Sequence, residues 1–98
     1  MHAVVFWLKP SAPTDTVEVM SDFYRNRISG VDGVEHAFVG PPAGTDREVV
    51  DGSYRLMSVL VFSSEDAAAA WQSDPVHDEF RSRFEAHFER VVVYDSIV

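Results

Sequence analysis

Four short apolar segments recur along the chain. The first, residues 2–9, is apolar at nearly every position and rich in β-branched and aromatic side chains, which is typical of a strand covered on both faces. Residues 34–40 and 54–62 have the same character, and so does the last segment, "RVVVYDSIV" at 90–98. The pattern predicts four β-strands.

A segment with helical spacing lies between the first two strands. After a break at "PSAP", Asp15 and Glu18 resemble a capping box, in which a side chain at the start of a helix bonds to the backbone three residues on. The helix expected there carries Val17, Met20 and Tyr24 on one face and ends at "ISGVDG", near its first glycine.

A second helical segment follows the third strand and is interrupted once. Ser63 and Asp66 form a similar box-like cap before the alanine-rich "EDAAAAWQ". Asp74 and Pro75 then break the helix and restart it, because the residue before a proline is disfavoured in the helical region. We expect the restarted helix to reach about Phe88.

The order βαββαβ predicts an α+β protein with one domain over residues 1–98. Its architecture would be a ferredoxin-like sandwich, an antiparallel sheet with both helices on one face. The segment 41–52 is longer than most connections in a compact domain, and loops of that length often carry function or an interface.

The sheet face without helices is also apolar. Its residues, by alternation along the strands, are Val5, Trp7, Met57, Val59, Val61, Val92 and Tyr94. An apolar patch of that size is expected to associate, and the simplest closed assembly is a twofold homodimer with the sheets face to face. The alternative is a third layer from the loop 41–52, but a dozen mostly polar residues cover little apolar area.

Composition excludes several classes of protein. The chain has 98 residues and no cysteine, so disulfides, thiol chemistry and thiolate zinc sites are absent, and a cytoplasmic location is expected. The net charge is −8 with no basic cluster, which argues against nucleic acid as a partner. The apolar runs are too short to cross a bilayer, so no membrane association is expected.

His77 is the most informative candidate for a functional residue. It lies in the first turn of the restarted helix, "DPVHDEF", and steps of three and four residues lead from it to Phe80, Phe84 and Phe88. The imidazole therefore heads an apolar row. That row is either ordinary core or the lining of a pocket, because small-molecule sites are mostly apolar too.

Three interpretations of His77 compete. It could be a structural histidine bonded to a backbone carbonyl. It could be a metal ligand, but neither His36 nor His87 is placed to help, so no metal is predicted. It could also be a general base or a ligand-binding group, since an imidazole with a pKa near 6.5 exchanges protons close to neutral pH.

Other polar residues fall on the same side as the helices. His2 shares its side of the strand with alternate apolar residues, so the two imidazoles could meet; otherwise it is a polar residue at a frayed strand end. Tyr24 is either core or part of a pocket. Ser58 interrupts an apolar strand and leaves room for a ligand or a bulky neighbour, and Asp95 could orient a histidine.

Taken together, these motifs resemble the stress-responsive dimeric α/β-barrel family, known as Dabb domains, over nearly the whole length. The opening "H-x-V-x-F" is matched by His2 to Phe6, the helix restart "D-P-x-H" by Asp74 to His77, and the closing "V-x-D" by Val93 to Asp95. The resemblance implies a ferredoxin-like protomer whose sheet pairs with that of a second protomer to form a barrel.

The resemblance also implies site residues. One member of the family, the plant olivetolic acid cyclase, folds a linear polyketide by aldol condensation without a cofactor; other members are stress-associated proteins without a clear reaction. By position, the two important histidines of the cyclase fall on His2 and His77, and a pocket tyrosine falls on Tyr24. The apolar pocket lining falls on Phe88, Val91 and Val93.

One position departs from the cyclase. Its second active-site tyrosine falls on Trp71, whose indole N–H donates a hydrogen bond but lacks an acidic hydroxyl, and whose bulk changes the space for a substrate. The same cyclisation therefore does not follow from the resemblance.

Two hypotheses remain, with a cofactor-free oxygenase as a third that no residue selects. In the first, a pocket without metal or cofactor binds an apolar, oxygenated small molecule, and His77 takes a proton from an activated carbon in a cyclase, isomerase or lyase reaction. His2 and Tyr24 would orient carbonyl oxygens, and Trp71 and Ser58 would contact the ligand. In the second, the protein is a non-enzymatic, stress-associated dimer without a pocket.

Overall fold

The computed structural model describes residues 1–98 and has the ferredoxin-like α+β fold, with four strands and three α-helices. Two short 3₁₀ helices, Ile28–Gly30 and Glu85–His87, complete the order of elements. The main elements are β1 (His2–Leu8), α1 (Thr16–Asn26), β2 (Val34–Gly40), β3 (Leu56–Phe62), α2 (Glu65–Trp71), α3 (Pro75–Phe84) and β4 (Phe88–Asp95).

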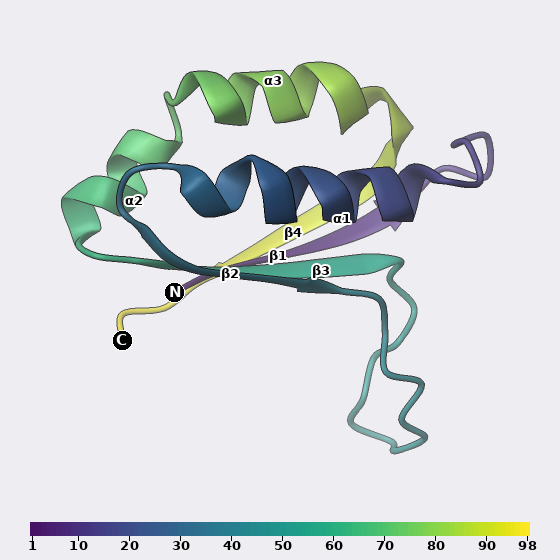
Figure 1. The fold of residues 1–98 in the computed structure, drawn as a ribbon. Coiled ribbons are helices and arrows are strands. Elements are labelled where there is room, and N and C mark those ends of the chain that lie inside the picture. Colours follow the sequence, from purple (N-terminus) through teal and green to yellow (C-terminus); the bar gives the residue numbers. More distant parts are fainter.

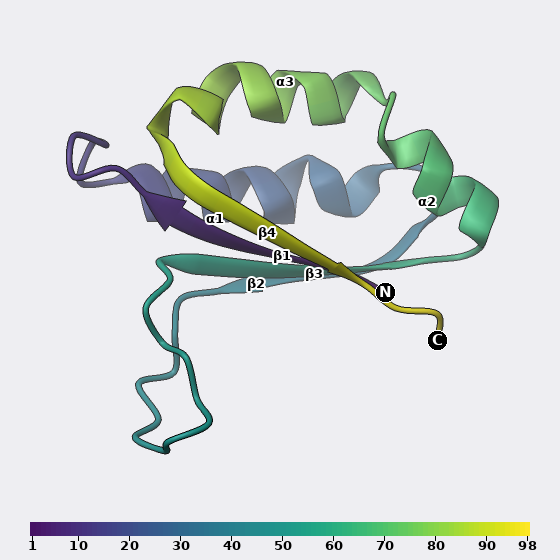
Figure 2. The same cartoon turned by 180° about the vertical axis from the view of Figure 1, so that it is seen from behind.

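The strands form one antiparallel sheet in the order β2-β3-β1-β4, with β2 and β4 at its edges. All helices lie on one face of the sheet, and the loop between β2 and β3 extends away from the opposite side (Figure 1). The view from behind shows α3 above β4 and β1 (Figure 2). No helix has the length and hydropathy that crossing a membrane requires.

The strand register places alternate residues on opposite faces, as the sequence predicts. Val4 lies opposite Ser58 of β3 and Val93 of β4, and all three side chains belong to the helix face. Val5 lies between Met57 and Val92 on the open face. A shift of one residue would exchange the two faces, so the register decides which residues can form a site under the helices.

Aromatic rings fill much of the space between helices and sheet. The ring of Phe80 on α3 contacts Phe23 and Tyr24 of α1, with ring centroids 5.6 and 5.3 Å apart, and Phe6 of β1 at 5.9 Å. An ion pair between Arg27 and Glu79, with N–O distances of 2.7 and 2.9 Å, joins the two helices on their outer side. The core therefore holds α3 at a defined position over the sheet.

The expected helix caps are only partly correct. Asp15 makes no side-chain cap, and the hydroxyl of Thr16 donates to the carbonyl of Pro13 at 2.6 Å. The Ser64 side chain caps α2 by accepting a hydrogen bond from the N–H of Ala67, one residue later than expected. The backbone N–H of the preceding Ser63 still donates to the carbonyl of Gly33. Asp74 does cap α3, accepting from the N–H of Val76 at 2.8 Å.

The restarted helix ends before Phe88, contrary to the sequence prediction. It stops at Phe84, one 3₁₀ turn follows, and Phe88 is the first residue of β4, paired with Leu8 beyond a bulge. Phe88 still faces the core, with its ring centroid 5.0 Å from that of Phe6, so its position in the apolar row fits either conformation. Backbone pairing with β1 places Phe88 in a strand.

The open face keeps large apolar side chains at the surface. Phe38 is 60% exposed and Tyr94 66% exposed. The loop between β2 and β3 touches this face only at one end, where Ser53 accepts a hydrogen bond from the Trp7 indole at 3.1 Å and Tyr54 packs against the same ring. The loop therefore does not form a third layer.

Candidate functional site

A cavity of about 330 Å³ lies between α3 and the sheet, bounded by β1, β4, α1 and the end of α2. Seven of the eight residues predicted for a site line it: His2, Tyr24, Trp71, His77, Phe88, Val91 and Val93. The eighth, Ser58, does not. Both imidazoles of interest therefore border the same space, although they are 75 positions apart in the sequence.

His77 is the third residue of α3, and the Asp74 cap with Pro75 fixes where that helix starts. Its ring meets the Trp71 indole edge to face, with centroids 5.0 Å apart. Its Nδ1 atom is buried and has no hydrogen-bond partner. Burial, followed by the positive charge of Arg81, lowers the pKa of His77 despite the opposing charge of Asp78, so the neutral imidazole is favoured.

His2 is held by a carboxylate of the neighbouring strand. The register pairs His2 with Asp95, and Nδ1 of the ring lies 2.5 Å from the Asp95 carboxylate. The His2 side chain is only 12% exposed, whereas that of Asp95 is 71% exposed. A proton on Nδ1 satisfies the carboxylate and leaves Nε2 as the free ring nitrogen.

Tyr24 projects from α1 into the cavity and is supported from behind. The Ser58 hydroxyl, fully buried in β3, donates to the Tyr24 oxygen at 2.9 Å. Burial raises the pKa of Tyr24 far above its usual range, although the Ser58 hydrogen bond acts the other way. Tyr24 is therefore a neutral hydrogen-bond donor, and Ser58 positions it.

The remaining predicted residues form the walls and the mouth. Trp71, at the end of α2, is 4% exposed and closes the cavity beside His77. Val91 and Val93 lie on the edge strand β4 and remain 42% and 46% exposed, so the cavity opens on that side. Phe88 lies where β4 begins, against the aromatic core.

Sequence reasoning missed two charged residues of the lining, Arg81 and Glu85. They lie one and two helical turns beyond His77 and form an ion pair, with Arg81 Nε 2.7 Å from the Glu85 carboxylate. Both side chains are 57% exposed. The signal was present, because a step of four residues from His77 reaches Arg81, but the row was followed only through its aromatic members.

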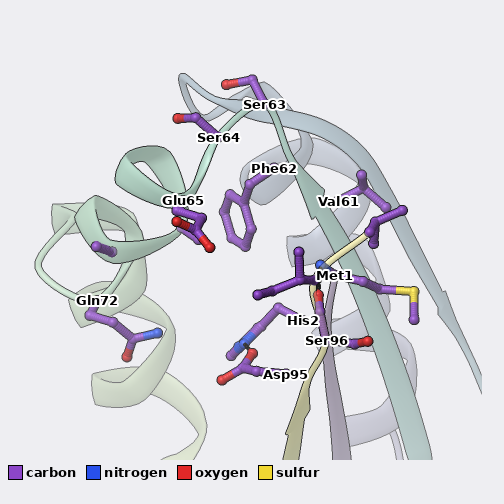
Figure 3. Close-up of a pocket in the computed structure, with 14 residues that line it drawn as sticks. Met1, His2, Val61, Phe62, Ser63, Ser64, Glu65, Gln72, Asp95 and Ser96 are labelled. Carbon is purple, nitrogen blue, oxygen red and sulfur yellow. Dashed lines mark hydrogen bonds and ion pairs between the residues drawn. The ribbon is translucent and has the colours of Figure 1, made fainter.

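A second, larger hollow lies on the other side of His2. Its volume is about 580 Å³, and Figure 3 shows His2 and Asp95 facing each other in it, with Gln72, the residue after α2, across from them. Part of its wall is Ile97 and Val98, which are 87% and 91% exposed. Because these residues pack against little else, the aromatic cavity under α3 is the better-formed site.

The cavity under α3 combines apolar walls with a few polar groups that converge on it, which is the usual composition of a small-molecule site. A neutral imidazole with an unpartnered nitrogen, a second imidazole with a free Nε2 and a phenol that can donate all reach the same space. No group of three or more histidine, aspartate or glutamate side chains is arranged to hold a metal ion.

The fold and this site place the chain in a class of small ferredoxin-like α+β proteins with a cavity between helices and sheet. The model of the stress responsive A/B barrel domain family, Dabb, matches residues 1–98, and the chain belongs to that family. None of the curated proteins compared with it by sequence matches.

Solved structures with the same fold come from plants and bacteria. A protein of Arabidopsis thaliana superposes with a TM-score of 0.82 at 21% identity, over 99% of this chain and 92% of that one. The hydroxynitrile lyase of Passiflora edulis gives 0.80 at 21% identity, over 99% and 90%. A dimeric ferredoxin-like protein of unknown function from Thermobifida fusca gives 0.79 at 18% identity, over 95% and 84%.

Proposed function

We propose that the protein binds a small, apolar, oxygenated molecule in the cavity under α3 and acts on it as a cofactor-free cyclase, isomerase or lyase. The observation that carries the proposal is the convergence of His77, His2 and Tyr24 on one cavity of about 330 Å³. Residues from three separate elements supply these groups, and packing alone does not require polar side chains at these three positions.

The proposed step is proton abstraction from a carbon next to a carbonyl. Neutral His77 takes the proton through a free ring nitrogen, the C–H bond breaks, and its electron pair moves onto the carbonyl oxygen as an enolate. Tyr24 donates a hydrogen bond to that oxygen, and His2 orients a second oxygen of the ligand. Return of the proton gives an isomer; attack of the enolate carbon on another carbonyl gives a ring.

Relatives support this class of reaction without defining the substrate. The Passiflora edulis protein is a hydroxynitrile lyase, so the fold is compatible with lyase chemistry. At 21% identity the likeness concerns the fold, and the chemistry proposed here depends on the residues of this cavity.

We also propose that the protein is a homodimer that pairs through the open face of the sheet. That face carries Trp7, Phe38 and Tyr94 among aliphatic side chains, and no element of the chain covers it. The neighbour from Thermobifida fusca is described as dimeric. A face-to-face pair would bury the apolar patch and leave the cavity under α3 accessible, because the cavity lies on the opposite side of the sheet.

Deuterium exchange tests the proposed proton transfer. Acetophenone in D₂O exchanges its methyl protons slowly, and ¹H NMR follows the loss of the methyl signal. We expect the wild-type protein to accelerate exchange and His77→Ala to lose most of that acceleration, roughly 100-fold or more, as for other general bases. The matched control is His87→Ala, which removes a histidine that does not line the cavity.

The same variants test binding. A panel of aromatic and polyketide-like acids should raise the melting temperature of the wild type, because a ligand that binds only the folded state stabilises it. If His77→Ala leaves the exchange rate and ligand binding unchanged, His77 has no part in the mechanism. If no compound binds or exchanges, the result contradicts the proposed function and favours the non-enzymatic interpretation.

A further inference from the structure

A cationic side chain stands at the mouth of the cavity, and the proton-transfer chemistry above does not use it. Arg81 and Glu85 are the only lining residues that carry a full charge at neutral pH, apart from the imidazoles; Arg81 is on α3, and Glu85 is the residue that directly follows this helix. The chain as a whole has sixteen acidic and eight basic residues, so a guanidinium in a ligand cavity is not a consequence of composition.

Arg81 lies between His77 and Glu85 on the cavity side of α3. Arg81 is one helical turn from both His77 and Glu85, and its Nε is paired with the Glu85 carboxylate. The charges agree with this order, because Arg81 is close enough to His77 to lower the pKa of the imidazole, whereas Glu85 has no such influence on it. Of the two charged lining residues, Arg81 is therefore the nearer to His77.

The pair between Arg81 and Glu85 is weak enough to open. Both side chains are more than half exposed, and an exposed ion pair four residues apart on a helix stabilises a protein very little. The order, arginine before glutamate, is also the less favourable one for a helix. Only one nitrogen of Arg81, Nε, is paired in the structure, which leaves the other donors of the guanidinium free.

We propose that Arg81 is a specificity-determining residue that binds the carboxylate of an acidic ligand at the cavity mouth. In the free protein, the Glu85 carboxylate pairs with Arg81 in place of the ligand carboxylate. This inference rests on the proposed function and adds the class of ligand, an apolar organic acid. Guanidinium and carboxylate form paired, charge-assisted hydrogen bonds. The apolar part of the acid lies inward toward Trp71 and Tyr24, and its carboxylate remains at the mouth.

The overall charge of the protein makes a preference for an acidic ligand a direct sign of a local positive group. A net charge of −8 repels an acid at long range, and this repulsion is screened beyond about 8 Å at physiological salt. A preference for an acid over its neutral analogue therefore requires a local positive group. Within the lining of the cavity, Arg81 is the only permanent one.

The test compares 2-naphthoic acid with 2-naphthamide, which has the same rings and no charge, by isothermal titration calorimetry near neutral pH. We expect the wild type to bind the acid at least 10-fold more tightly than the amide. In Arg81→Gln the affinity for the acid falls by 10-fold or more, while that for the amide stays within about twofold. Glu85→Gln tightens binding of the acid several-fold, because the competing carboxylate is gone.

Arg83→Gln is the matched control. Arg83 is on the same helix, but its guanidinium stacks over Phe23 and Phe84, 5.3 and 5.1 Å from their ring centroids, and it does not line the cavity. The substitution removes the same charge and should keep the preference for the acid. An equal loss in Arg81→Gln and Arg83→Gln would reveal a general charge effect and would overturn the assignment of Arg81.

Failure of this inference differs from failure of the proposed function. If the wild type binds acid and amide equally, and Val93→Trp, which fills the cavity, abolishes both, the cavity is a ligand site but Arg81 does not select acids. If neither compound binds the wild type, the assignment of Arg81 is overturned, and the deuterium exchange and the wider panel decide the proposed function separately. If Val93→Trp binds both compounds unchanged, the cavity is not the ligand site and both proposals are wrong.

Discussion

The two faces of the sheet differ in what covers them, although the same strands supply both. On the helix face, Phe80 is 5% exposed and five other aromatic rings surround it. On the open face, Phe38 is 60% exposed and its ring stacks only on His36. One face thus obtains its core and its cavity within the chain, whereas the other is left for association.

The comparison shows how one alternating pattern can encode two tasks. Residues of β1 at even positions, such as His2 and Phe6, belong to the cavity side, and those at odd positions, such as Val5 and Trp7, belong to the open side. Because successive side chains point to opposite faces, substitutions on one face can be designed to leave the other intact.

The largest expected effect is a difference in stability between two phenylalanine variants, one on each face of the sheet. Phe80→Ala removes a ring packed on all sides, so the free energy of unfolding should fall by about 3–5 kcal/mol. Phe38→Ala should cost the folded protomer much less. Its effect should depend on protein concentration, because in the proposed dimer that ring is buried by association.

Urea unfolding, followed by circular dichroism at several protein concentrations, measures both variants. Equal losses of stability, independent of concentration, would contradict the assignment of Phe38 to an interface.

A charge in the centre of the open face should break the proposed dimer. Val59 lies on β3 between β2 and β1, paired with Phe38 and Ala3. Val59→Asp would bury an unpaired carboxylate from each protomer, so the dissociation constant should rise by roughly 100-fold or more.

Sedimentation velocity gives the mass of the assembly, and Ala86→Asp adds the same charge at an exposed position away from the sheet. If Val59→Asp remains as dimeric as Ala86→Asp, association uses another surface. The cavity should be unaffected in either variant, which the binding of 2-naphthoic acid can verify.

The smallest expected effect concerns the pH dependence of stability on the cavity side. The folded protein lowers the pKa of His77 through burial and Arg81, with a smaller contribution from His2, against the carboxylates of Asp78 and Asp74. The unfolded chain therefore binds a proton more readily as the pH falls below about 6.5. Stability from this group is fully present above that pH and is lost as the pH falls toward the folded-state pKa.

His77→Gln should accordingly flatten the decline of the melting temperature between about pH 7.5 and 5.5, compared with the wild type. The same substitution at His87 provides the reference for removal of a histidine outside the cavity. A wild-type slope that His77→Gln leaves unchanged would mean that the imidazole is not desolvated.

Much of the fold could be predicted because its signals are local or periodic. The strands, the proline restart at Pro75 and the assignment of Val4 and Val5 to opposite faces follow from residue type and spacing. The errors are at boundaries. Phe88 begins a strand and not the last helical turn, because pairing with Leu8 outweighed a helical periodicity that the residue also fits.

The sequence predicted which residues line the cavity better than it predicted what each of them does. His2, Tyr24 and His77 were expected on one side of the sheet, and they line one cavity. Ser58 was expected to contact a ligand, whereas its hydroxyl lies behind Tyr24 and positions that phenol. Arg81 was not expected at all, because a charged residue on a helix is usually solvated.

The sequence by itself determined the element order, the two-sided apolar character of the sheet and the side on which His2 and His77 lie, because these depend on alternation along single strands and helices. Only the tertiary structure decided that the space between Trp71, His77 and the sheet is hollow and that Asp95 holds His2. It also decided that a guanidinium stands at the mouth. Cavities and cross-strand pairs depend on how closely separate elements approach, and no local pattern of residues specifies that distance.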